Sequence, residues 1–147
     1  MNNMMRIEFS ALAENEAFAR TAAAAFIMPL DPTVEELTEI KTAVSEAVSN
    51  SVIHGYKHEE SAKNKIAMEC TVFSNGKVVI LIEDYGVGIE DVDKAMEPMF
   101  STGNGEERSG MGFTVMESFM DKLKVKSEKG EGTTVVMTKF LDIVNGI

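Results

Sequence analysis

Glu46-Ala47-Val48-Ser49-Asn50 is the stretch of this sequence on which the rest of the chain depends. It lies within an apolar-periodic run from residue 33 to residue 55, and this run predicts a long helix. Glu46 and Asn50 are four residues apart and project from the same side of that helix. Val44 and Val48 lie about half a turn away, so the polar pair stands opposite the aliphatic stripe. Such a pair is either solvated surface or one wall of a site.

The predicted helix has a clear beginning and end. Two start signals overlap: Asp31 as the N-cap before a proline, or a capping box between Thr33 and Glu36. Gly55 supplies the end. We expect its core stripe to contain Val34, Leu37, Ile40, Val44, Ala47, Val48 and Val52.

Two elements precede this helix. Alternating apolar residues at positions 5–9 predict a half-buried strand at a sheet edge. Residues 14–28 predict an alanine-rich helix that ends at a proline. Arg20 lies off the centre of its apolar stripe, and is either an i,i+4 partner of Glu16 or a contact for another chain. We expect this stripe to contain Phe18, Ala22, Ala25 and Phe26.

Two hairpins and another helix follow. The first hairpin turns at Asn75-Gly76, a pair that strongly favours a tight β-turn between alternating segments. We expect strands at 65–73, 77–83, 123–128 and 133–141, and a helix at 113–121. This order predicts an α/β two-layer sandwich with a mixed, largely antiparallel sheet and helices on one face.

Length and charge limit the classes of function. With 147 residues, 44% of them hydrophobic, we expect a single domain over residues 1–147. A formal net charge of −10 disfavours direct binding to nucleic acid or membranes, and leaves protein partners. The single cysteine, Cys70, fits a reducing compartment. No apolar run approaches the roughly 18 residues of a spanning helix. We therefore expect a cytoplasmic protein.

Two glycine-containing segments bear on whether Glu46 and Asn50 are solvated surface or one wall of a site. Ser109-Gly110-Met111-Gly112-Phe113 opens a helix, where unpaired N–H groups and the helix dipole favour a phosphate. Asp84-Tyr85-Gly86-Val87-Gly88 follows a buried strand, and an ionised carboxylate there can accept a hydrogen bond from an amine such as adenine's. Taken singly, each is also compatible with an ordinary helix start or turn. Residues 90–109 between them predict a mobile lid or a plain flexible loop.

If these segments bind a nucleotide next to Glu46 and Asn50, the two helix residues acquire chemical roles. Mg²⁺ prefers oxygen ligands and keeps several waters, so the Asn50 carboxamide and nucleotide phosphates could hold it. Glu46 could then act as a general base, a role typically worth about 10²–10⁴-fold. The alternative is two exposed polar residues on a surface helix, which spacing alone does not exclude.

Together these segments resemble a known family. Four motifs occur in the order of the N, G1, G2 and final boxes of the Bergerat-fold (GHKL) ATPases: Glu46-x-x-x-Asn50, Asp84-x-Gly86-x-Gly88, Ser109-Gly110-Met111-Gly112-Phe113 and Gly130-x-Gly132-Thr133. The resemblance covers almost the whole chain. Further stretches are similar to the serine-kinase anti-sigma factors, and the last to their sporulation branch: Phe18-Ala19-Arg20, residues 45–50, His54-Gly55-Tyr56 and residues 106–113.

The resemblance implies roles for individual residues. Glu46 would be the general base, Asn50 the Mg²⁺ ligand and Asp84 the partner of the adenine amine, with Thr133 joining through water. Arg108 would lie near the γ-phosphate or at the partner surface, and Arg20 on the face that meets other proteins. The implied ATP-binding residues are Asn50, Asp84, Gly86, Gly88, Thr102, Arg108, Ser109, Gly110, Met111, Gly112, Phe113 and Thr133.

The resemblance also implies a function. Members of this family are homodimers that hold a sporulation sigma factor inactive in their ATP form and phosphorylate a serine on an anti-sigma-factor antagonist. A stress-response anti-sigma kinase and a non-catalytic, ATP-dependent sigma-factor binding module are alternatives. A histidine-kinase catalytic domain fits less well because His54 and His58 both follow Asn50. An acidic α/β domain without these activities would require four ordered motifs to coincide.

Overall fold

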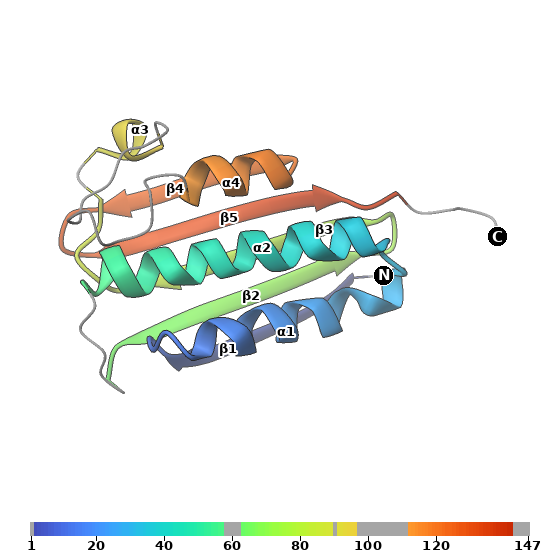
Figure 1. Cartoon of the computed structure of the whole chain (residues 1–147), viewed down its shortest axis with the longest axis horizontal. Helices are drawn as coiled ribbons and strands as arrows, with labels where there is room; N and C mark the ends of the chain where they lie inside the picture. Colours follow the sequence, from blue (N-terminus) through green and yellow to red (C-terminus); the bar gives the residue numbers. More distant parts are fainter. Residues whose placement is uncertain (1, 58–62, 90, 97–111, 143–147) are drawn as a thin grey trace.

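The computed structural model describes residues 2–57, 63–89, 91–96 and 112–142. In these residues the helices lie over one face of a five-stranded sheet (Figure 1). None of the helices in this part of the chain is long and apolar enough to cross a membrane. The elements, in chain order, are β1 (Asn2–Ser10), α1 (Asn15–Ile27), η1 (Met28–Leu30), α2 (Val34–Asn50), η2 (Ser51–Gly55), β2 (Lys65–Phe73), β3 (Lys77–Asp84), α3 (Val92–Ala95), α4 (Gly112–Phe119), β4 (Lys122–Glu128) and β5 (Gly132–Phe140).

The strand order in the sheet is β1-β2-β3-β5-β4, with β1 at an edge as predicted. The predicted α/β sandwich with helices on one face is confirmed. Its sheet is antiparallel at every pair among the described strands, whereas the prediction of a mixed sheet allowed for a parallel pair. The reason is the second hairpin: the connection through α4 places β4 at the outer edge, and β5 then turns back between β4 and β3.

The first hairpin forms where the Asn-Gly pair predicts it. Gly76 has a φ of 97°, a conformation that an L side chain rarely adopts, and its amide donates to the Phe73 carbonyl at 2.9 Å. The Asn75 side-chain oxygen accepts from the Lys77 amide at 3.1 Å. These bonds fix the register of β2 and β3.

Helix α2 begins with the capping box, the second of the two predicted start signals. Thr33 Oγ1 accepts from the Glu36 amide at 3.0 Å, and Glu36 Oε1 accepts from the Thr33 amide at 2.9 Å. Asp31 instead adopts a left-handed conformation at the end of η1. The other carboxylate oxygen of Glu36 accepts from the Asp142 amide at 2.8 Å, so the start of α2 is tied to the chain that follows β5.

The core lies between the helices and the sheet, and three predicted core residues are outside it. Ala25 is exposed because it lies on the outer side of α1, two residues from the buried Ala23 and Ile27. Val34 is 82% exposed because it is the first residue of α2. Phe18 is 53% exposed and packs edge-to-face against Phe9 at 6.1 Å, because α1 turns its alanines inward instead. The buried residues of α1 are Ala19, Ala23 and Ile27, and those of α2 include Ile40, Val44, Ala47 and Val48.

Candidate functional site

Three segments that are distant in sequence meet at the side chain of Asp84, at the end of β3. This residue is 4% exposed. The Ser51 hydroxyl in η2 donates to Oδ2 at 2.9 Å, and the Gly86 amide donates to Oδ1 at 2.9 Å. Thr133 in β5 is the cross-strand neighbour of Asp84. A single buried carboxylate therefore joins the end of α2, the turn after β3 and the start of β5.

The alternation of β3 places Asp84 at this position. Val78, Ile80 and Ile82 are buried, and Asp84 is the next residue on the same side. Gly86 then allows the turn to pass close to η2, because a Cβ at this position would clash with the Gly55 carbonyl oxygen. That oxygen accepts a hydrogen bond from the Val87 amide at 2.9 Å. The Asp-x-Gly pattern thus sets a close contact as well as a turn.

The surroundings of Asp84 act on its charge in opposite directions. Burial raises the pKa of its carboxyl, whereas hydrogen bonds from the Gly86 amide, the Ser51 hydroxyl and the Thr133 amide lower it, and the net pKa is raised. The ionised form is therefore incompletely compensated inside the protein. A ligand amine that donates a hydrogen bond to this carboxylate would stabilise its charge.

Tyr56, the residue after η2, holds the turn after β3 in place through two hydrogen bonds. Its hydroxyl donates to the Lys65 carbonyl at 2.6 Å and accepts from the Tyr85 amide at 2.8 Å. Burial raises the pKa of the phenol, so it stays protonated and keeps both bonds at neutral pH. Residues 51–55 form a π-helical turn, closed by the Tyr56 amide donating to the Ser51 carbonyl at 2.9 Å. Such wide turns recur at functional sites.

On the other side of this turn, Ser127 in β4 holds the chain in place through hydrogen bonds. Its hydroxyl oxygen accepts from the Ile89 amide at 2.6 Å, donates to the Gly132 carbonyl at 2.9 Å and lies 2.8 Å from the hydroxyl of Thr133. Because Ser127 has one hydroxyl hydrogen, Thr133 is the donor of this last bond. Asp84, Ser127 and Thr133 line a shallow cleft of about 180 Å³.

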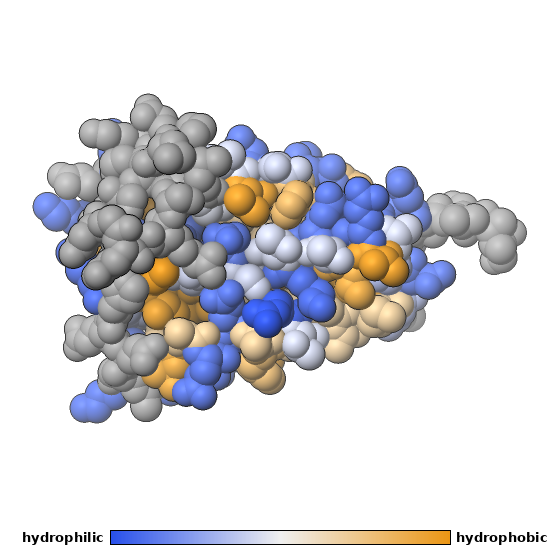
Figure 2. All heavy atoms as spheres, in the orientation of Figure 1, coloured by the Kyte–Doolittle hydropathy of each residue, from blue (hydrophilic) through white to orange (hydrophobic). Residues whose placement is uncertain are grey.

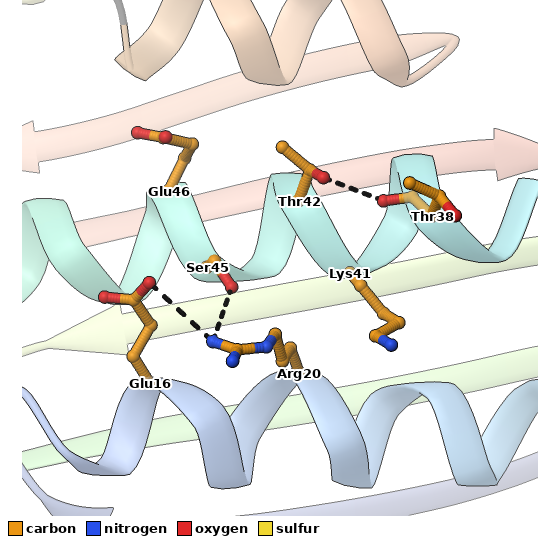
Figure 3. Close-up of a pocket in the computed structure, with 7 residues that line it drawn as sticks. All are labelled: Glu16, Arg20, Thr38, Lys41, Thr42, Ser45 and Glu46. Atoms are coloured by element: carbon orange, nitrogen blue, oxygen red, sulfur yellow. Dashed lines mark hydrogen bonds and ion pairs between the residues drawn. The ribbon is translucent and has the colours of Figure 1, made fainter. Parts of the chain in front are cut away.

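The polar side of α2 faces the beginning of α4. A Cβ on Gly112 would lie 3.0 Å from both terminal atoms of the Asn50 carboxamide, so this glycine packs directly on Asn50. Phe113, the next residue, packs against the hydrophobic core. Asn50 and Glu46 are half-buried, and Glu46 projects from α2 on the side away from α1 (Figure 3).

A groove of about 250 Å³ runs between α1 and α2 and reaches Glu46 (Figure 3). Arg20 lies in it, with its guanidinium 3.9 Å from the Glu16 carboxylate and 3.5 Å from the Ser45 hydroxyl. The i,i+4 contact with Glu16 was one of the two predicted roles of Arg20. Its side chain is also 39% exposed, so it remains accessible to another chain.

The predicted catalytic and ATP-binding residues fall into three groups. Asp84, Gly86, Gly88 and Thr133 gather at the turn after β3, and Gly88 fits there because a side chain at its φ of 77° would clash with the Glu128 carbonyl. Glu46, Asn50, Gly112 and Phe113 lie along α2 and at the start of α4. The others, together with most of the predicted lid at 90–109, lie outside the described residues: Thr102, Arg108, Ser109, Gly110 and Met111.

Sequence reasoning missed the hydrogen-bonding roles of Ser51, Tyr56 and Ser127. A signal was present for two of them, because both are polar residues at positions of an apolar stripe. Ser51 comes four residues after Ala47 on the buried side of the helix, and Ser127 follows Leu123 and Val125 in the alternation of β4. A polar residue at such a position needs a buried hydrogen-bond partner.

Known proteins match this arrangement over nearly its whole length. Residues 9–139 match the family described as the histidine kinase-like ATPase domain. The anti-sigma F factor of Clostridium beijerinckii is 52% identical over 144 residues, which cover 98% of this chain and 99% of that protein. The anti-sigma F factor of Clostridium botulinum is 54% identical over 143 residues, which cover 97% of this chain and 98% of that protein.

Solved structures share the fold. The RsbU and RsbW domains of a Mycobacterium tuberculosis protein align with a TM-score of 0.66 at 19% identity, over 95% of this chain and 32% of that one. The histidine kinase domain of a blue-light-activated histidine kinase from Erythrobacter litoralis aligns with a TM-score of 0.58 at 21% identity, over 86% of this chain and 60% of that one. At these identities the likeness concerns the fold alone.

Proposed function

This chain belongs to the histidine kinase-like ATPase family and, within it, to the anti-sigma F factors, and we propose that it is an ATP-dependent anti-sigma factor that also phosphorylates a serine of its antagonist. In this proposal it holds a sporulation sigma factor inactive in the ATP-bound form. Phosphorylation releases the antagonist, and the sigma factor then stays captured.

The observation that carries the nucleotide site is the convergence on Asp84. A buried carboxylate with a raised pKa accepts hydrogen bonds from Ser51 and Gly86 and lies beside Thr133. An exocyclic amine such as adenine's supplies the additional donor that this carboxylate favours. Close backbone contacts at Gly86 hold the turn in place without a side chain between it and a flat base. We therefore assign the base to this end of the sheet.

We assign the phosphates of ATP to the other half of the site. The start of α4 lies against Asn50, and the backbone amides of Gly112 and Phe113 belong to the first turn of this helix. A helix N-terminus favours anions through its unpaired N–H groups and its dipole. The Oδ1 oxygen of Asn50 suits a Mg²⁺ ligand, and a bound Mg²⁺ would neutralise charge on the phosphates. Arg108 and Thr102 of the lid complete the proposed set.

Glu46 is the proposed general base. It lies one helical turn before Asn50 on the same side of α2. The acceptor serine oxygen attacks the γ-phosphorus in line, the bond from that phosphorus to the bridging oxygen of ADP breaks, and the serine proton passes to the Glu46 carboxylate. Positioning and charge neutralisation supply most of such a reaction.

The partner surfaces are part of the same proposal. Arg20, accessible on α1, belongs to the face that meets the sigma factor and the antagonist. We also propose a homodimer in the cytoplasm. Strand β1 lies at the edge of the sheet and is a surface that a second copy could cover. Sedimentation of the purified protein with and without ATP tests this state directly.

The activity is tested with labelled ATP, Mg²⁺, the full chain and its antagonist. We expect phosphoserine on the antagonist, no transfer by the Glu46→Gln variant, and retained ATP binding in that variant. Transfer that persists in Glu46→Gln would remove the proposed role of Glu46. Equal sigma-factor capture with ATP and a non-hydrolysable analogue, without any labelled product, would instead support a non-catalytic binding module. The sigma factor that co-purifies from sporulating or stressed cells separates the sporulation circuit from the stress-response one.

A further inference from the structure

The groove between α1 and α2 is lined by polar and charged side chains, and most of them have no role in the proposed reaction. Polar side chains gather over the middle of the helix-bearing face of the molecule (Figure 2). The groove is lined by seven residues, five of them from α2: Glu16, Arg20, Thr38, Lys41, Thr42, Ser45 and Glu46. Its volume of about 250 Å³ suits a short piece of extended chain rather than a whole domain.

Two charges of opposite sign stand along the α2 side of this groove. Glu46 lies at one end and Lys41 five residues earlier (Figure 3). At about 1.5 Å per residue, the two positions are about 7.5 Å apart along the helix axis. An extended segment rises about 3.3 Å per residue, so this distance corresponds to two or three residues of a bound peptide.

The cations of the groove are not equivalent. Arg20 contacts both Glu16 and Ser45. Lys41 has no ion-pair partner within the described ranges 2–57, 63–89, 91–96 and 112–142, and it is half-exposed. In a chain with a net charge of −10, a cation in this situation favours an acidic residue of an approaching segment.

Two threonines of α2 that line the groove present acceptors: Thr42, between the two charges, and Thr38, one turn earlier. Thr38 Oγ1 donates to the Val34 carbonyl at 2.9 Å, and Thr42 Oγ1 donates to the Thr38 carbonyl at 2.9 Å. Each hydroxyl hydrogen is thereby used within α2, and the oxygen lone pairs remain for the N–H groups of a bound backbone. Thr42 and Glu46 both project on the side of α2 away from α1, whereas Lys41 points towards α1 (Figure 3).

We propose that this groove binds the acceptor-bearing segment of the antagonist, and that Lys41 selects an acidic residue two or three positions from the acceptor serine. The proposal rests on the serine-kinase activity proposed above. Glu46 receives the serine hydroxyl and repels an acidic residue at that point, while Lys41 attracts one a short distance away. The two charges together set the register of the segment.

The test uses full-length antagonist variants in which each of the four positions on either side of the acceptor serine is Glu, Gln or Lys in turn. For the wild-type kinase we expect kcat/KM to be about three- to tenfold higher with Glu than with Lys at one position, the size expected when attraction at a half-exposed cation is replaced by repulsion. Lys41→Glu should reverse this preference at that same position, mainly through KM, with ATP affinity unchanged. Lys124→Glu, the same charge change on β4 outside the groove, is the matched control and should keep the wild-type preference.

The outcomes separate the two proposals. Phosphoserine formation by the wild type, with the same Glu-to-Lys ratio for wild type and Lys41→Glu at every position, would overturn the role of Lys41 alone. An equal shift in Lys124→Glu would also overturn it, because the effect would then come from net charge. Absence of phosphoserine with every antagonist, in a wild-type protein that binds ATP, would overturn the kinase activity and the groove proposal together.

Discussion

The Ser51 hydroxyl donates a hydrogen bond to the carboxylate of Asp84 at 2.9 Å, across 33 positions of sequence. Both residues are buried. This bond joins the end of the helix that carries Glu46 and Asn50 to the strand end that carries the adenine-binding candidate. The two halves of the candidate nucleotide site are therefore held to one another by a residue that belongs to neither predicted motif.

Replacing Ser51 by Ala should loosen this connection. The variant leaves a buried carboxylate oxygen without one of its donors, which costs about 1–3 kcal/mol of unfolding free energy. Because the lost donor stabilises the charged form of Asp84, its pKa rises further, and the destabilisation should be larger at pH 8 than at pH 4. Urea unfolding at the two pH values measures this. Ser49→Ala is the control, since Ser49, two residues earlier on α2, is also buried but is not a hydrogen-bond partner of Asp84. Equal losses at both pH values would contradict the charge-dependent role.

Asp84→Asn should separate stability from nucleotide binding. The pKa of Asp84 is raised in the folded protein, so its contribution to stability is complete below the unfolded-state pKa of about 3.9 and is lost as the pH rises through the folded-state pKa. The amide cannot ionise, and the unfolding free energy at pH 7 should stay within about 1 kcal/mol of the wild type. The affinity for ATP should fall about tenfold or more, because a hydrogen bond to a charged group is lost.

Calorimetric titration with ATP and urea unfolding at several pH values measure both quantities for Asp84→Asn. Glu83→Gln is the matched control: it changes the neighbouring carboxylate, which is bonded to Arg6 and Tyr85 instead. Wild-type ATP affinity in a folded Asp84→Asn protein would remove Asp84 from the site.

Tyr56→Phe should weaken the turn that carries Asp84. The change removes two hydrogen bonds, at 2.6 Å to the Lys65 carbonyl and at 2.8 Å from the Tyr85 amide. We expect a loss of about 1–3 kcal/mol in unfolding free energy and weaker ATP binding. Tyr85→Phe is the control, because Tyr85 is 54% exposed and its hydroxyl bonds to Glu83 at the surface. A similar small effect in both variants would show that the Tyr56 bonds are replaced by water.

Short-range patterns predicted much of this fold, and long-range contacts account for what they missed. The Asn75-Gly76 turn and the Thr33–Glu36 capping box need only neighbouring residues, and both are present. The inward side of α1 was misjudged because its many alanines leave the helical period poorly marked, so Phe18 was placed in the core instead of Ala19. The glycine motifs located the turn at Asp84, but its partner Ser51 depends on how η2 docks on β3, which no local pattern specifies.

Glu36 should make stability depend on acid pH. Burial acts to raise the pKa of this carboxyl, but hydrogen bonds from the Thr33 and Asp142 amides and the nearby Lys139 ammonium outweigh it, and the pKa is lowered. The stabilisation is therefore present above the unfolded-state pKa of about 4.3 and is lost as the pH falls through the lower folded-state pKa. Glu36→Ala should cost about 1–2 kcal/mol at pH 7, and the cost should shrink in acid. Thermal unfolding between pH 2.5 and pH 7 measures it, with exposed Glu35→Ala in the same helical turn as the control. A cost that is the same at both ends of this range would contradict the capping charge.

The Cys70 thiol should not react with thiol reagents until the sheet opens. Its side chain is fully buried on β2, between its cross-strand neighbours Met5 and Ile80, and burial raises the pKa of the thiol to about 12. At pH 8 the thiolate fraction is then about 10⁻⁴. A disulfide reagent such as Ellman's should therefore not label the native protein over hours, and should label it completely and rapidly in denaturant. At intermediate urea concentrations the labelling rate should follow the population of open molecules, so it reports the free energy of opening the central strands.

A Thr71→Cys variant in the Cys70→Ala background places a thiol on the half-exposed neighbouring position and should react in the native state. Fast, stoichiometric labelling of Cys70 in protein that retains its native circular dichroism would show that β2 opens locally, without unfolding of the sheet.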